Sequence, residues 1–90
     1  MIKNNPPHRE LVAQGALLLD VRTPAEYHEG HVPQALNLPV QELPARLHEV
    51  GPTHRPIVVY CRSGGRSAQA AQLLARAGYQ VHNIGPMSAW

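Results

Sequence analysis

The stretch that most constrains the fold of this chain is Pro56–Cys61, PIVVYC, which runs directly into a glycine-rich loop. Its β-branched residues show no polar alternation, and such a run is typical of a strand covered on both faces of a sheet. Ninety residues, 43% of them hydrophobic, can enclose one core. The sequence therefore predicts a single domain over residues 1–90 with a buried strand near its centre.

Short apolar runs alternate with helical segments on both sides of this strand. Further strands are expected at Ala16–Val21, Ala35–Pro39 and Tyr79–Ile84. Helices are expected at about His8–Gln14, from Pro24 to a stop at Gly30, from Pro44 to about Val50, and from Ser67 to Ala77 before Gly78. This alternation predicts an α/β fold in which helices cover both faces of a parallel sheet, with ligands bound beyond the carboxyl ends of the strands.

Helix signals are clearest at Thr23–Glu26. Thr23 precedes Pro24 and stands three residues before Glu26, which predicts a capping box with proline at the first helical position.

The only cysteine, Cys61, stands at the carboxyl end of the central strand, in the segment YCRSGGRS. Gly64 and Gly65 allow the sharp turn into the next helix, so that backbone amides and the helix dipole converge on one point. The same groups favour a thiolate, whose pKa at helix N-termini falls from about 8.5 to roughly 3.5–7.5. The pattern predicts a nucleophilic Cys61 in an anion cradle; the alternative is a buried small hydrophobic residue.

A single cysteine excludes an internal disulfide and a redox dithiol, so a sulfur species formed on Cys61 must leave to an external acceptor. We expect a reducing, cytoplasmic compartment. No lysine follows Lys3, which excludes a nucleotide-binding P-loop. His28 and His31 could join Cys61 around zinc, but no second thiol or further paired histidine completes the set, and neither metal nor cofactor is expected.

Charge and hydropathy exclude other classes of partner. The net charge of +2 is scattered, so nucleic acid is not expected, and neither a leader nor a run approaching the roughly 18 apolar residues of a membrane span is seen. Arg22, Arg62 and Arg66 belong to segments that we expect to meet, which gives a local positive charge suited to a small anion.

Three segments carry a resemblance to the rhodanese family, and specifically to its small single-domain sulfurtransferases. They are LLLDVRTPAEYHEGHVPQALNLP, IVVYCRSGGRS and GPMSAW, in the family's order. The resemblance implies a mostly parallel sheet of five strands flanked by helices. It also implies that Cys61 accepts sulfur from a donor such as thiosulfate, holds it as a persulfide, and passes it to cyanide or a thiol.

The resemblance also implies roles for the loop. The transferred sulfur and the anionic end of the donor would be bound by the Arg66 side chain and by the loop amides, which belong to Arg62, Ser63, Gly64, Gly65, Arg66 and Ser67. Arg62 would reach the sulfonate end of the donor. A sulfur-relay protein is a candidate partner.

Polar residues of the first signature are expected to be structural. We place Asp20 and Arg22 on opposite faces or ends of a strand terminus, with Asp20 accepting backbone amides and Arg22 pairing with a carboxylate, Glu26 being the candidate. His31 is expected to shape a turn together with Gly30 and Pro33 by bonding to the backbone.

Ser63 and Ser67 have two interpretations. They are either turn and helix-cap residues or hydroxyl donors to the persulfide, and capping is favoured for Ser67.

The chain departs from the family pattern in three places. Pro86 stands where a second glycine is common, which stiffens the turn and removes an amide donor. The sequence stops at Trp90, where relatives usually continue through a helix, so an apolar surface is expected to be bare or covered by a neighbouring copy. Ile2 and Lys3 could supply only a truncated edge strand, which leaves four to five strands.

Two other functions share part of this pattern. A phosphatase or arsenate reductase of the dual-specificity kind has five residues between cysteine and arginine, whereas Cys61 and Arg66 enclose four, a ring suited to a single sulfur. A non-catalytic interaction module is disfavoured because Cys61 and its loop are intact.

Overall fold

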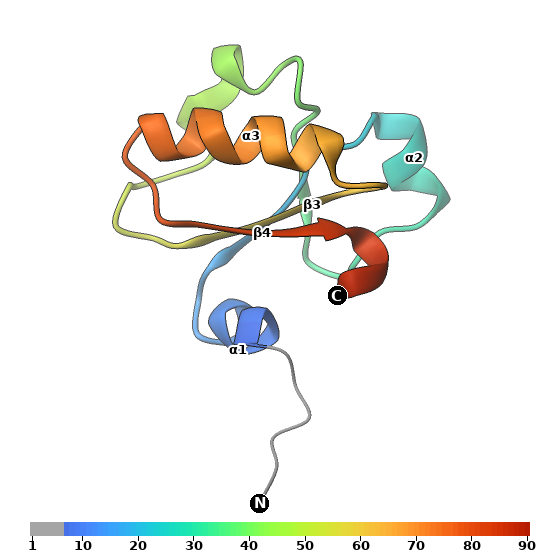
Figure 1. The fold of residues 1–90 in the computed structure, drawn as a ribbon, viewed down its shortest axis with the longest axis horizontal. Coiled ribbons are helices and arrows are strands. Elements are labelled where there is room, and N and C mark those ends of the chain that lie inside the picture. Colours follow the sequence, from blue (N-terminus) through green and yellow to red (C-terminus); the bar gives the residue numbers. More distant parts are fainter. Residues whose placement is uncertain (1–6) are drawn as a thin grey trace, which may run out of the picture.

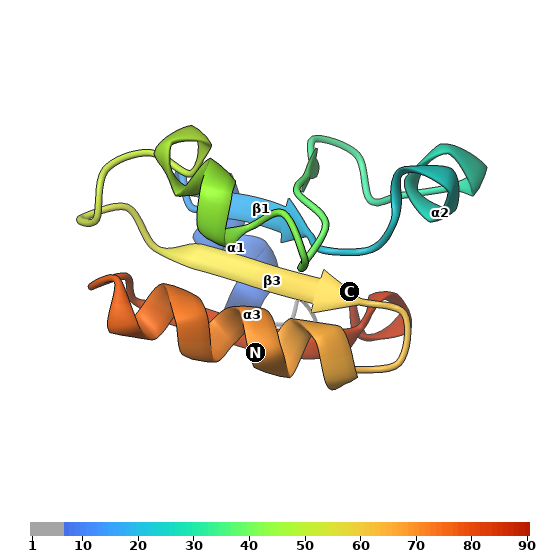
Figure 2. The same cartoon turned by 90° about the horizontal axis from the view of Figure 1, so that it is seen from above.

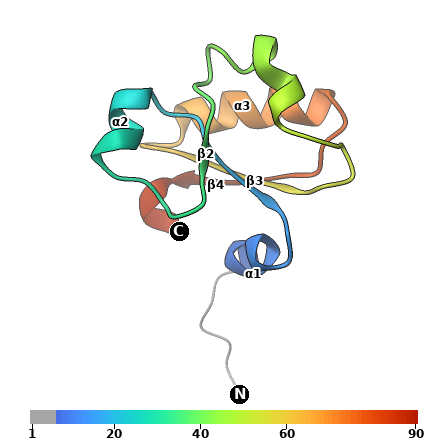
Figure 3. The ribbon, with the colours of Figure 1, turned by 180° about the vertical axis from the view of Figure 1, so that it is seen from behind.

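A computed structural model describes residues 7–90, which form one four-stranded parallel sheet. The strands lie in the order β2-β1-β3-β4, and Figure 3 labels β2, β3 and β4 as seen from behind. Their bounds are β1 Leu17–Asp20, β2 Leu36–Asn37, β3 Ile57–Cys61 and β4 Val81–Pro86. The predicted parallel α/β sheet is confirmed with four strands, and the edge strand considered for Ile2 and Lys3 lies outside the described residues.

Helices cover both faces of this sheet, as predicted. The helical elements are α1 Pro7–Ala13, α2 Pro24–Glu29, α3 Gly65–Arg76 and the short 3₁₀ segments η1 Pro44–Glu49 and η2 Met87–Ala89. Helix α3 lies on one face of the sheet and α1 on the other (Figure 1), and α3 runs alongside β3 (Figure 2). In the part of the chain described, no helix has the length and apolar character needed to cross a membrane.

The two central strands are buried along their whole length, and alternate side chains enter two different cores. On the α3 side, Leu19, Val59 and Cys61 pack in a cluster that includes Leu74 of α3. On the other side, Tyr60 packs in a cluster with partly buried residues of α1 and with Trp90. This alternation places Cys61 beneath α3 and turns Tyr60 toward the opposite face.

Two predicted elements differ from the structure. Strand β2 is only two residues long, although Leu38 N and Val40 N still donate to carbonyl oxygens of Asp20 and Val21. The helix expected after Pro44 is 3₁₀, interrupted where Arg46 leaves helical angles at φ −118° and ψ 20°.

Pro86 is the last residue of β4 and pairs with Cys61, so it lies in the edge strand and not in the following turn. An edge strand tolerates proline because its outer backbone donors need no partner strand. The position brings the start of η2 beside the end of β3.

Candidate active site

The Cys61 side chain is enclosed by the turn that follows it. It has 0% exposure, and the amide of Gly64 donates to its Sγ at 2.9 Å. The Cys61 thiol donates to Ser67 Oγ at 3.3 Å, while Ser67 Oγ donates to the Gly64 carbonyl at 3.1 Å. The Ser67 hydroxyl can rotate to donate to sulfur when the thiol ionises. The loop therefore supplies donors to an anionic sulfur.

These contacts lower the pKa of Cys61. Burial alone raises the pKa of the thiol, but hydrogen bonds from the Ser67 side chain and from the amides of Ser67, Gly64 and Ser63 outweigh it. The net effect favours the thiolate, which is the nucleophilic form.

Of the two adjacent glycines, only Gly64 needs its conformational freedom. Gly64 is the N-cap of α3 with φ 110°, a left-handed conformation that other residues resist. Gly65 begins the helix without a positive φ, and a Cβ built there meets no atom within 4 Å. The expectation that both glycines shape the turn holds for Gly64 alone.

The capping role favoured for Ser67 is wrong. Helix α3 begins at Gly65, two residues before the expected start, and Ser67 lies in its first turn with no exposed surface. Its hydroxyl consequently faces Cys61, in line with the second interpretation. Ser63 is exposed at the outer side of the loop.

Arg66 links the start of α3 to α2. Its Nη1 and Nη2 donate to the two carboxylate oxygens of Glu26 at 2.6 and 3.0 Å. Glu26 also completes the predicted capping box by accepting from the Thr23 backbone N at 3.0 Å. Bonds from Arg66 first and Thr23 second lower the pKa of Glu26 to about 2. Because the guanidinium is occupied by Glu26, binding of an anion by the Arg66 side chain stays a prediction.

Arg22 pairs with Asp20, and the expected pairing with Glu26 is wrong. Arg22 Nε and Nη2 donate to Asp20 Oδ1 and Oδ2 at 3.0 and 2.7 Å, and Nη2 also donates to the Gly30 carbonyl at 2.7 Å. The two side chains are not on opposite faces, because they bond directly to each other just past the end of β1. Both are buried, as the predicted structural role requires.

A tyrosine completes this buried network. Tyr60 OH donates to Asp20 Oδ2 at 2.7 Å and accepts from the Val32 amide at 3.1 Å. Burial is the main reason that the pKa of Tyr60 is raised. The network holds the segment after α2 against the end of β3.

His31 of the first signature is also structural. His31 Nδ1 donates to the Tyr27 carbonyl at 2.8 Å, and its ring stacks on that of Tyr27 at 3.6 Å between centroids. This is the backbone bond predicted for it. Among residues 7–90, no three His, Cys, Asp or Glu side chains are grouped as a metal site requires.

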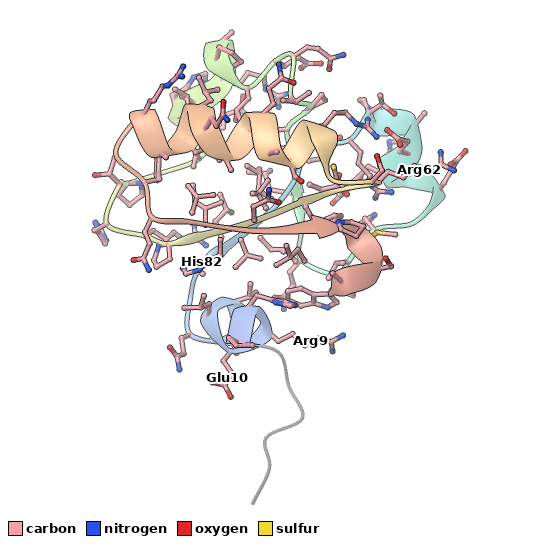
Figure 4. All side chains as sticks on the ribbon, viewed as in Figure 1. Arg9, Glu10, Arg62 and His82 are labelled. Atoms are coloured by element: carbon pink, nitrogen blue, oxygen red, sulfur yellow. The ribbon has the colours of Figure 1, made fainter. Side chains whose placement is uncertain are left out.

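A pocket of about 280 Å³ adjoins the loop and collects side chains from distant segments. Its walls are Arg22, Glu26, Glu29, Gly30, Arg62 and Met87. Figure 4 shows Arg62 on the loop beside α2. The predicted meeting of Arg22 and Arg62 is therefore found, while Arg66 reaches the pocket only through its partner Glu26.

A larger cavity of about 410 Å³ opens at the opposite end of the sheet, bordered by Ala16 and Pro56. Among the described residues that line it are His54 and Arg55 but no cysteine, serine or threonine, so the smaller pocket beside Cys61's loop is the better candidate for chemistry.

Sequence reasoning missed Glu29 and Met87 as pocket residues and Tyr60 as a partner of Asp20. The register Asp20↔Tyr60 follows from aligning the two buried strands, which could have indicated that pair. Nothing in the local sequence distinguishes Glu29 or Met87, since their place depends on how the ends of α2 and β4 meet the loop.

Comparison with known proteins assigns the family. The model of the rhodanese-like domain matches residues 6–90. The chain belongs to the rhodanese-like domain family. Among similar sequences, a sulfurtransferase of Allochromatium vinosum is 47% identical over 79 residues, covering 86% of this chain and 73% of the relative. The thiosulfate sulfurtransferase PspE of Escherichia coli is 39% identical, covering 74% of this chain and 66% of its own.

Solved structures agree with the fold. A rhodanese with anions from E. coli matches this rhodanese with a TM-score of 0.78 and 33% identity, covering 84% of this chain and 92% of that one. The family assignment and the sulfurtransferases among the similar sequences support a sulfurtransferase.

Proposed function

We propose that this rhodanese transfers sulfane sulfur from thiosulfate, or a similar small anionic donor, to a thiol or cyanide through a persulfide on Cys61. The observation that carries the proposal is the enclosure of Cys61 Sγ by the amide of Gly64 and the hydroxyl of Ser67, which together lower the pKa of the thiol.

The first step is nucleophilic displacement at sulfur. The Cys61 thiolate attacks the outer sulfur of thiosulfate, a bond forms between these two sulfurs, and the donor's S–S bond breaks with its electron pair leaving on sulfite. Because Cys61 is fully buried, the loop must move off the sulfur for the donor to reach it. The terminal persulfide sulfur is anionic, so the amides that favour the thiolate also favour this product.

Arg62 is suited to the donor's anionic end. It follows Cys61 directly, is exposed, and lines the pocket beside the loop. In the second step a nucleophilic acceptor attacks the outer sulfur of the persulfide, and the Cys61 thiolate leaves with the electron pair of the S–S bond. A protein thiol in a sulfur relay is chemically equivalent to a small thiol here.

The persulfide can be tested directly by intact-mass measurement. After incubation with thiosulfate and desalting, the protein should carry one added sulfur, because the chain holds no second cysteine to displace it as a disulfide. Cyanide or a small thiol should remove the added mass. Cys61→Ser should fold, load no sulfur and lose transfer by at least about a thousandfold, since a hydroxyl is not ionised at neutral pH.

The rival functions give different outcomes in this experiment. An interaction module or a phosphatase would take up no sulfur from thiosulfate or other persulfide donors. Unchanged mass in folded protein with a free Cys61 thiol would contradict the proposal.

A further inference from the structure

Two of the charged side chains lining the pocket beside the active-site loop have no partner in the structure. Within residues 7–90, neither Arg62 nor Glu29 makes a hydrogen bond or ion pair. Both are exposed, and they come from different elements, Glu29 from the end of α2 and Arg62 from the loop after β3. Each is therefore available to a ligand.

The other charges of the pocket are already neutralised. Arg22 forms a bidentate ion pair with Asp20, and Arg66 donates from both terminal nitrogens to Glu26. Among the described residues, the pocket consequently offers one free cation, Arg62, and one free carboxylate, Glu29, and its apolar wall is Met87.

The pocket lies at the same end of the sheet as the reacting sulfur. Arg62 follows Cys61 in sequence, and Met87 follows Pro86, the residue paired with Cys61 across the sheet. A small molecule held between Arg62 and Glu29 is thus beside the end of β3, from which a persulfide would be discharged.

A simple dianion is not the best match for these walls, because Glu29 repels it while Arg62 attracts it. A zwitterion matches both: its carboxylate pairs with Arg62 and its ammonium with Glu29. We propose that the acceptor of this rhodanese is a small thiol of amino-acid type, bearing an ammonium and a carboxylate. The inference rests on the proposed function and names the substrate class of its second step.

In the transfer to this acceptor, one S–S bond forms for each one that breaks. The acceptor's thiolate attacks the outer sulfur of the Cys61 persulfide, a new S–S bond forms in the product persulfide, and the old bond's electron pair returns to Cys61 as thiolate. No outside oxidant or reductant is needed.

Three related thiols separate the two charges. L-Cysteine carries both, N-acetyl-L-cysteine lacks the ammonium, and L-cysteine methyl ester lacks the carboxylate. Persulfide-loaded protein is mixed with each, and discharge is followed by loss of the added mass. Rates are expressed per thiolate present, since these thiols ionise to different extents at one pH.

For the unmodified protein, kcat/KM should be about three- to fivefold higher for cysteine than for either derivative, the size expected of one exposed ion pair. In Glu29→Gln the advantage over N-acetylcysteine should disappear while that over the methyl ester remains. In Arg62→Gln the pattern should be reversed. Glu42→Gln removes an equal charge from outside the pocket and should change neither ratio.

Equal kcat/KM values for the three thiols, or ratios that change equally in all three variants, would overturn this inference. If loading and cyanide discharge persist in that case, the proposed function stands and only the acceptor class is wrong. If no sulfur is loaded at all, the proposed function itself fails.

Discussion

At the scale of single residues, the lowered pKa of the Cys61 thiol depends in part on the Ser67 hydroxyl. Ser67 is buried in the first turn of α3 and is the only side chain in the described residues that hydrogen-bonds to Cys61 Sγ. Its position differs from that of Ser63, which is exposed on the same loop.

Ser67→Ala should therefore raise the pKa of Cys61, because the bonds that offset burial are weakened. The rate of alkylation by iodoacetamide, measured against pH, should inflect at higher pH than in the unmodified protein. Stability should fall by about 1 kcal/mol through the lost hydrogen bonds. Ser63→Ala keeps its amide and should leave the inflection in place; an equal shift in both variants would contradict the assignment.

The two neighbouring glycines should respond in opposite ways to the same substitution. Gly64→Ala forces a left-handed conformation on alanine and should cost about 1–2 kcal/mol and disturb the amide that faces sulfur. In Gly65→Ala the new methyl group enters open space at the start of a helix, so this substitution should stabilise the protein by about 0.5 kcal/mol. Urea unfolding of both variants tests this, and similar losses from both would show that Gly65 is also constrained.

At the scale of elements, the ion pair between Glu26 and Arg66 joins α2 to the start of α3, which lie at the same end of the sheet. Glu26 caps its own helix and also binds the next one, so one carboxylate fixes two helix termini. The contact joins α2 to the first turn of α3, the turn that also carries Ser67 beside Cys61.

Glu26→Gln should reduce stability at neutral pH but not in strong acid. Because the folded pKa of Glu26 is about 2, below the ordinary 4.5, its contribution is complete above about 4.5 and is lost as the pH falls through 2. The difference in free energy of unfolding between unmodified protein and variant should therefore shrink over that range. Glu29→Gln, on the same helix without a partner, serves as the control. A difference that does not depend on pH would contradict the ion-pair explanation.

The helices and strands also show which elements a sequence can specify. The buried strands β1 and β3 and the capping box of α2 were predicted because their signals are local. Strand β2 and η1 were overestimated since their short segments are held by contacts with β1 and the core instead of by their own propensity.

At the scale of the whole molecule, the sequence indicates that Arg22 and Arg62 come together but not which charged side chains form ion pairs. Two arginines and two carboxylates allow more than one set of ion pairs. Whether Arg22 pairs with Asp20 or with Glu26 is determined by how the chain folds into the sheet. The pairing of Arg66 with Glu26 spans forty positions, so no local pattern reveals it. Only the fold shows that the side chains of Arg62 and Glu29 have no ion-pair partner among the described residues.

The complete burial of Cys61 also bears on how the protein withstands air and other thiols. A thiol that ionises readily is ordinarily the first to be oxidised or to form mixed disulfides. Here the sulfurs of two copies cannot reach the roughly 2.05 Å of a disulfide bond while each remains covered by its own loop. The fold thus lowers the pKa of the Cys61 thiol while keeping its sulfur away from solvent. Under the proposed function, a sulfur stored on Cys61 would be shielded in the same way, and an acceptor would reach it only when the loop opens.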